Sequence, residues 1–158
     1  MQEDYIEIMI QSLIKKEEIL DALIDLNKRQ EQDINDPTLK ADDFREVVSK
    51  KADLIEAINK LDEGFQTVYD GVKSELEQNK SSHEQEIVTM QDLIRRITDK
   101  SNEILAQERR NKNLAESKFE GVRKQVKEVR GSQKALGEYY RNMMKLNFVD
   151  PQFMDKKK

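Results

Sequence analysis

The sequence predicts an all-α protein, an elongated antiparallel hairpin or bundle of three long amphipathic helices with coiled-coil-like packing. Apolar residues recur at spacings of three, four and seven along most of the chain, as on helices with one apolar face. Charged residues make up 38% of the 158 residues and the mean hydropathy is -0.88, values typical of long, surface-rich helices. Such values also mark disordered chains, but the sustained periodicity argues against disorder. We expect one elongated helical domain, residues 1–158.

The first helix is expected over about residues 4–35. It ends at Asn35-Asp36-Pro37 because Pro37 lacks an amide hydrogen and disfavours helical conformation at Asp36. A short connection follows, to about Lys40. The stripe of this helix consists of Ile6, Ile10, Leu13, Leu20, Leu23, Ile24 and the polar Asn27.

The second helix is expected over about residues 41–78. Gly64 and Gly71 lie seven residues apart, and therefore on one face, although each costs about 1 kcal/mol relative to Ala inside a helix. Two interpretations stay open: another backbone approaches this face closely, or surface glycines are tolerated. The stripe of this helix consists of Phe44, Val47, Val48, Lys51, Ile55, Ile58, Leu61, Phe65, Val68, Val72 and Leu76.

The third helix is expected over about residues 82–146, followed by a C-terminal tail, residues 147–158. Ser81 with Glu84, or Ser82 with Gln85, has the form of a capping box at its start. The seam of this helix consists of Met90, Ile94, Ile97, Ser101, Ile104, Glu108, Asn111, Ala115, Phe119, Val122, Val126, Val129, Gln133, Leu136, Tyr140 and Met143.

The third helix is also expected to be the longest and to run unbroken through the polar stretch 107–113. At 1.5 Å per residue it would span roughly 90 Å, against about 50 and 57 Å for the first two helices. It would therefore project beyond them. The projecting seam needs a cover, which predicts a homodimer or a bound partner there.

Charge is unevenly distributed along the chain. Residues 1–79 hold 20 acidic and 10 basic residues, residues 80–158 hold 12 acidic and 18 basic residues, and the net charge is -4. Because the chain is expected to fold back on itself, the two halves should present helix faces that attract each other. Each surface pair contributes under roughly 1 kcal/mol, so these charges favour register more than stability.

The sequence shows no motif that is typical of catalysis or metal binding. His83, the single histidine, has no second histidine four residues along, so we expect it to be solvated and predict neither a metal nor another cofactor. The glycines are too far apart for a phosphate-binding loop. These patterns predict a protein that is not an enzyme. The absence of cysteine fits a reducing cytoplasm, and no signal peptide or membrane span is expected.

The stretch 107–134 is basic, which is one feature of a nucleic-acid-binding helix. Its charges flank the apolar seam as the side positions of a coiled coil do, and the acidic first half of the chain can meet them. Nucleic acid is therefore the weaker interpretation.

The C-terminal segment differs from the rest of the chain in being rich in aromatic residues and methionine. Such side chains suit adaptable protein-binding surfaces, although a tail that folds back over the bundle end is the alternative. Together with the seam before it, the segment predicts a client-binding or partner-binding surface. Its residues are Val122, Val126, Val129, Leu136, Tyr139, Tyr140, Met143, Met144, Leu146, Phe148, Phe153 and Met154.

Three stretches carry a resemblance to a known family. They are Leu61-Asp62-Glu63-Gly64-Phe65-Gln66-Thr67-Val68-Tyr69, Ala106-Gln107-Glu108-Arg109-Arg110-Asn111-Lys112 and the tail Phe153-Met154-Asp155-Lys156-Lys157-Lys158. With them the chain resembles the FlgN-type flagellar export chaperones, and the related FliT-type is not separated from these by the sequence. The resemblance implies a cytoplasmic chaperone that binds hook-associated or filament subunits through its C-terminal helix and tail and delivers them to the export gate.

The function expected from the sequence is thus client holding by helix-in-groove packing. The alternative is a structural, dimeric coiled-coil scaffold without a secreted client. A nucleic-acid binder that uses the basic third helix is a weaker alternative.

Overall fold

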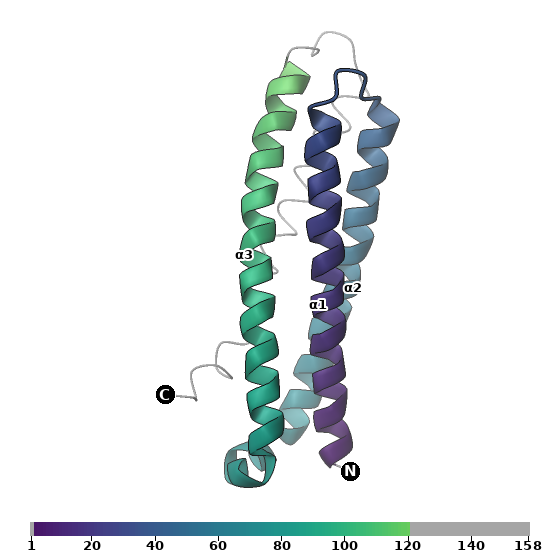
Figure 1. Ribbon diagram of the computed structural model, residues 1–158. Coiled ribbons are helices and arrows are strands. Elements are labelled where there is room, and N and C mark those ends of the chain that lie inside the picture. The colour runs from purple at the N-terminus through teal and green to yellow at the C-terminus, as the bar shows by residue number, and fades with distance from the viewer. Residues whose placement is uncertain (1, 121–158) are drawn as a thin grey trace.

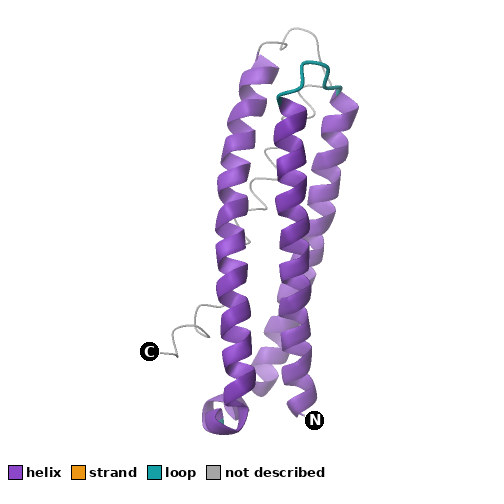
Figure 2. Ribbon diagram, viewed as in Figure 1, coloured by secondary structure: helices purple, strands orange, loops and turns teal. Residues whose placement is uncertain are grey.

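The computed structural model describes residues 2–120, and these form a bundle of three helices without a strand (Figures 1 and 2). The helices are α1 (Gln2–Ile34), α2 (Ala41–Gln78) and α3 (Glu84–Glu120), and a 3-10 turn, η1 (Lys80–His83), precedes α3. The all-α prediction is confirmed. The predicted ends of α2 agree with the structure, and those of α1 differ from it by one or two residues.

The start of α3 differs from the prediction. Ser81 and Ser82 lie within η1, where the backbone N–H of Ser82 donates to the carbonyl of Asn79 at 3.1 Å, and the α-helix begins only at Glu84. The 3-10 turn thus stands where a capping box was expected. From there α3 runs unbroken through residues 107–113, as predicted, and its expected course beyond Glu120 lies outside the described residues.

The three helices run up, down and up, so that α1 and α3 are parallel to each other and antiparallel to α2 (Figure 1). α1 packs closely against both of the other helices, whereas the backbones of α2 and α3 stand further apart. Long side chains bridge α2 and α3, among them Phe44 and Phe119, whose rings meet edge to face with centroids 5.0 Å apart. The bundle is therefore built around α1.

The buried apolar residues form two clusters. The main cluster fills the bundle from the end where α1 begins to the level of Ile104. It includes Tyr69, which was not part of the predicted stripe of α2. A smaller cluster lies at the end where α1 is joined to α2. It consists of Ile34, Phe44, Val48, Ala115 and Phe119.

The connection between α1 and α2 is fixed by local hydrogen bonds. The Asp36 carboxylate accepts from the backbone N–H and the hydroxyl of Thr38, at 2.8 and 2.7 Å, and these bonds lower the pKa of Asp36. The Lys118 ammonium of α3 donates to the carbonyls of Ile34 and Asp36, at 3.0 and 2.5 Å. A cation is favourable at a helix C-terminus, so Lys118 ties the end of α1 to α3.

Gly64 and Gly71 face open space. A methyl group added at either residue would meet nothing within 4 Å in the described part of the chain. Of the two interpretations that the sequence left open, residues 2–120 therefore agree with tolerated surface glycines, since no backbone among them comes close to either residue.

Candidate functional site

The predicted client-binding residues all fall between residues 122 and 154, outside the described residues 2–120. The structure therefore places none of them, and they stay a prediction. Within the described bundle the candidates are a buried polar layer, a shallow hollow at the start of α3 and a half-covered face of α2.

The polar layer lies between the main and the smaller apolar cluster, and all its side chains are buried. Its centre is an ion pair between α2 and α3: the Lys51 ammonium lies 2.8 Å from the Glu108 carboxylate, and their side chains are 0% and 2% exposed. Burial lowers the pKa of Lys51, and the carboxylate of Glu108 opposes this shift. The layer consists of Asn27, Gln30, Lys51, Gln107, Glu108 and Asn111.

The amide side chains of the layer connect the ion pair to α1. Lys51 and Asn111 both donate to the Gln30 side-chain oxygen, at 2.7 and 3.1 Å. Asn111 also donates to the Asn27 carbonyl at 3.0 Å, and Asn27 donates to the Gln107 side chain at 3.2 Å. Such a network fits one vertical alignment of the three helices and penalises a shift by one turn. We infer that the layer sets the register of the bundle.

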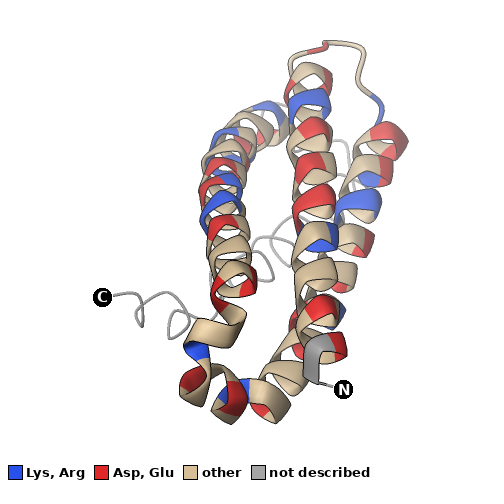
Figure 3. Cartoon of the chain, turned by 60° about the horizontal axis from the view of Figure 1, so that its bottom comes forward, with Lys and Arg blue, Asp and Glu red and all other residues tan. Residues whose placement is uncertain are grey.

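A second set of ion pairs joins the helices nearer the surface. Glu17 of α1 lies 2.8 Å from Arg96 and 3.0 Å from Lys100 of α3, and Lys100 also lies 2.8 Å from Asp21. The hydrogen bond from Arg96 is the main cause of a lowered pKa at Glu17. These contacts join the acidic half of the sequence to its basic half, as the charge asymmetry predicts. Figure 3 shows both acidic and basic residues on all three helices.

The buried Lys16 of α1 pairs with Asp62 of α2 at 2.8 Å. Burial raises the pKa of Asp62, and the Lys16 ammonium only partly opposes that shift. The Lys16 and Lys51 side chains are both buried and therefore closed to a ligand, which indicates a structural role for these two lysines.

His83 is buried, with 8% exposure, which corrects the expectation that it is solvated. Its Nε2 atom lies 3.2 Å from the Glu75 carboxylate of α2. The 3-10 turn folds the imidazole back against the end of α2, a placement that the turn residues alone did not indicate. Among residues 2–120 no group of three or more His, Asp and Glu side chains is arranged to hold a metal ion.

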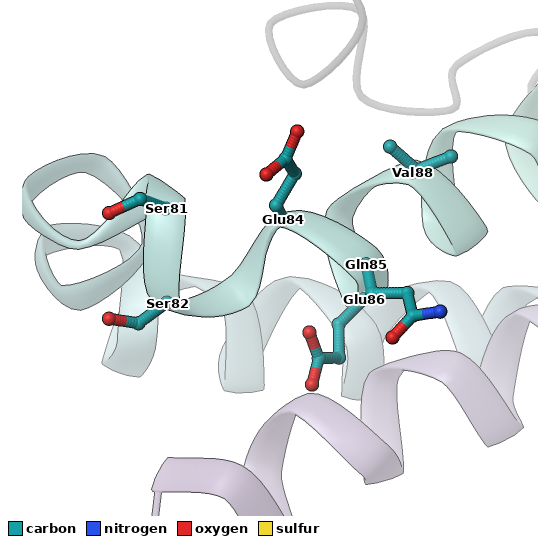
Figure 4. Close-up of a pocket in the computed structure, with 6 residues that line it drawn as sticks. All are labelled: Ser81, Ser82, Glu84, Gln85, Glu86 and Val88. Atoms are coloured by element: carbon teal, nitrogen blue, oxygen red, sulfur yellow. The ribbon is translucent and has the colours of Figure 1, made fainter.

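The hollow at the start of α3 is shallow and polar, with a volume of about 550 Å³, and lies open to solvent. Figure 4 shows that its side chains point in different directions: Glu84 and Ser82, for example, project away from each other. They do not converge on a common point, so this arrangement does not form a ligand site. Its lining consists of Ser81, Ser82, Glu84, Gln85, Glu86 and Val88.

One face of α2 is only half covered. Leu61 and Val68 were expected in the core stripe, but they and Leu54 are half-buried. Leu54 and Val68 pack against the main cluster from its margin. Gly64 and Gly71, both exposed, border the same face. The apolar arc of α2 is thus wider than the bundle covers, and the spacing of these residues along the sequence could have indicated this.

Comparison with known proteins identifies no relative: no family model, no curated protein and no solved structure matches the chain. No helix within residues 2–120 has a stretch long and apolar enough to span a lipid bilayer.

Proposed function

We propose that this protein is a non-enzymatic chaperone of the flagellar export type. It holds a helical hook-associated or filament-type subunit in the cytoplasm before that subunit is passed to the export gate. The observation that supports this proposal best is the unbroken course of α3 to Glu120, which leads the chain directly into the predicted client-binding residues.

The spacing of the apolar residues at the end of α3 agrees with this proposal. Ala115 and Phe119 are buried in the smaller cluster, and the sequence continues with Val122, Val126 and Val129 at steps of three, four and three. α3 is 37 residues long up to Glu120, and α2 is 38 residues long. A helix continued to residue 146, as predicted, would carry its seam past the end of α2. A seam without a partner in the bundle suits the capture of a client helix.

The ion pairs and the polar layer give the proposed function a rigid base. Together with Lys118, they tie α3 to α1 at Glu17, at Asn27 and at Ile34, which lie between the middle of α1 and its C-terminal end. The segment beyond residue 120 therefore starts from a fixed point. A fixed starting point lowers the entropy lost when a client binds.

We propose that the client packs apolar side chains, at spacings of three and four, against the predicted client-binding residues. Leu136, Tyr140 and Met143 lie at helical spacing within that set and offer large, adaptable contact area. The tail beyond residue 146, with Phe148, Phe153 and Met154, would add contacts to the client or to the export machinery.

Affinity purification from a flagellated host tests the proposal. The tagged full chain should recover a flagellar or secreted helical subunit, and the triple variant Leu136→Ser, Tyr140→Ser, Met143→Ser should not. A variant with Ile8→Ser and Val88→Ser is the matched control, because both side chains are exposed apolar residues of the bundle. Recovery of no such subunit by the unaltered chain would rule out the proposal, as would loss of the client in the control alone.

A further inference from the structure

α2 carries a second apolar stripe, which we call the α2 lane. Its members follow one another at steps of three and four, so they lie along one line of the helix. Its large residues recur every seven residues, and its small residues also recur every seven residues, three positions further along the chain. The α2 lane consists of Leu54, Ala57, Leu61, Gly64, Val68 and Gly71.

The α2 lane borders solvent along its whole length. Its large residues and Ala57 are half-buried, and its two glycines are exposed. It extends over roughly 25 Å of the helix, at 1.5 Å per residue. An apolar strip of this length along a helix edge is a surface on which another helix can pack.

Within residues 2–120 the structure gives no reason for glycine at two positions of the α2 lane. Both glycines lie inside a long helix, neither has a positive φ, and an added methyl group would meet open space. Alanine would therefore favour the helix at both positions. Glycine is useful where a second backbone must come close, and nothing in the described chain comes close here.

We propose that the α2 lane is the interface of an antiparallel, two-fold symmetric dimer of this chain. When two copies of α2 cross about a point between Asp62 and Glu63, residues equally far from that point face each other. Leu54 then faces Gly71 of the second copy, Leu61 faces Gly64 and Val68 faces Ala57. Every large side chain meets a small one, and the symmetry repeats each pair.

The parallel arrangement lacks this fit. It would place Leu61 on Leu61 and Gly64 on Gly64, which alternates crowded and empty layers and loses packing contacts at the glycines. The α2 lane is therefore complementary to itself in one orientation, as a two-fold interface requires. Its outer flank carries Asp53, Lys60, Thr67 and Ser74, all exposed, and the antiparallel arrangement sets no like charges among them directly opposite each other.

The length of the α2 lane limits the affinity of the dimer. The area that a helix strip of roughly 25 Å in length can bury is much smaller than the roughly 800 Å² per partner of a standard interface. We therefore expect a reversible dimer with a dissociation constant on the order of 10 to 100 µM. The dimer involves the bundle alone and does not depend on the proposed client.

Single cysteines test the orientation directly, because the chain has no cysteine of its own. Leu61→Cys places two sulfurs near the two-fold axis, about 5 Å apart along the helices, whereas Ser74→Cys places them about 35 Å apart. Under mild oxidation of the full chain, Leu61→Cys should form a disulfide-linked dimer and Ser74→Cys should not. Equal crosslinking of both variants, or crosslinking of Ser74→Cys alone, would overturn the proposal. Crosslinking of Leu61→Cys only to another protein would do so too.

The glycines provide the second test. A variant with Gly64→Leu and Gly71→Leu should have a higher urea midpoint in dilute solution, because leucine favours the helix and nothing obstructs its Cβ atom. The same variant should dimerise at least tenfold more weakly in sedimentation equilibrium, because leucine fills the gaps that receive Leu54 and Leu61. Stronger association would show that the α2 lane associates through unspecific apolar contact and not through the pairing of large with small residues, and it would overturn the proposal. So would an unaltered chain that stays monomeric at several hundred micromolar.

Discussion

Replacing Lys51 by methionine should destabilise the bundle by about 3–5 kcal/mol, the usual cost of removing one partner from a buried ion pair. The ammonium lies 2.8 Å from the Glu108 carboxylate, and both side chains are almost fully buried. Coulomb's law gives about 6 kcal/mol at this separation for an effective dielectric constant of about 20. Desolvation of the two ions offsets most of that attraction, so the net value of the intact pair is small.

The variant Lys51→Met therefore loses stability mainly because the buried Glu108 carboxylate loses its ion pair with the Lys51 ammonium. The double variant Lys51→Met, Glu108→Met removes both charges and should recover most of the loss, ending within about 2 kcal/mol of the unaltered protein. The energy of interaction in the double-mutant cycle should thus exceed about 1.5 kcal/mol. The cycle is measured by urea unfolding followed by circular dichroism at neutral pH.

Lys50 offers the matched control, since it is the neighbouring residue and pairs with Glu46 at 3.0 Å with both side chains about half exposed. Lys50→Met should cost no more than about 0.5 kcal/mol, because exposed pairs on a helix contribute little. Two results would contradict a buried, energetically coupled Lys51–Glu108 pair. One is a loss for Lys51→Met as small as that for Lys50→Met, and the other is a loss for the double variant equal to the sum of its two single losses.

Three further predictions concern the surface pairs, the smaller cluster and the tail. Glu17→Gln should cost up to about 1 kcal/mol of stability at pH 7. The lowered pKa of Glu17 gives a stabilisation that is full above the ordinary glutamate pKa of about 4.3 and is lost as the pH falls through the lower folded pKa. The urea unfolding curves of variant and parent should therefore converge on acidification, and a gap between them that widens would contradict this assignment. Phe119→Ala should cost about 3–5 kcal/mol of stability. It should also speed amide hydrogen exchange at residues 34–48 more than at residues of the main cluster, because the polar layer separates the two clusters. Equal acceleration of exchange in both clusters would contradict this and show a single cooperative core. Deleting residues 139–158 should leave the circular dichroism of the bundle and its urea midpoint unchanged while client capture is lost; retained capture would argue for the scaffold alternative.

The helices could be predicted from the sequence because periodicity and Pro37 determine them locally. The predicted seams even included Asn27, Lys51, Glu108 and Asn111, four polar residues that the structure buries. Heptad position thus predicted burial in spite of residue type. Which of these residues pair with each other depends on the vertical alignment of the helices, and the spacing within one helix does not contain that information.

Other features depend on geometry that the sequence pattern does not carry. His83 was expected in solvent because it stands in a polar turn, but the 3-10 conformation of that turn sets it against Glu75. Leu61 and Val68 were expected in the core, but they are half-buried, because the apolar arc of α2 is wider than the face that the bundle covers. The candidate site could be predicted only as a property of residues 122–154, and the α2 lane was missed because its large and small residues look like part of one broad apolar stripe.

The proposed function is tested most directly by calorimetric titration of the purified full chain with the terminal helical segment of a hook-associated subunit from the same host. We predict saturable binding with one segment per chain and a negative heat-capacity change, as burial of apolar surface requires. The variant Leu136→Ser, Tyr140→Ser, Met143→Ser should show no heat of binding. Absence of binding by the unaltered chain to every hook-associated and filament subunit of that host would contradict the proposal that this protein is an export chaperone.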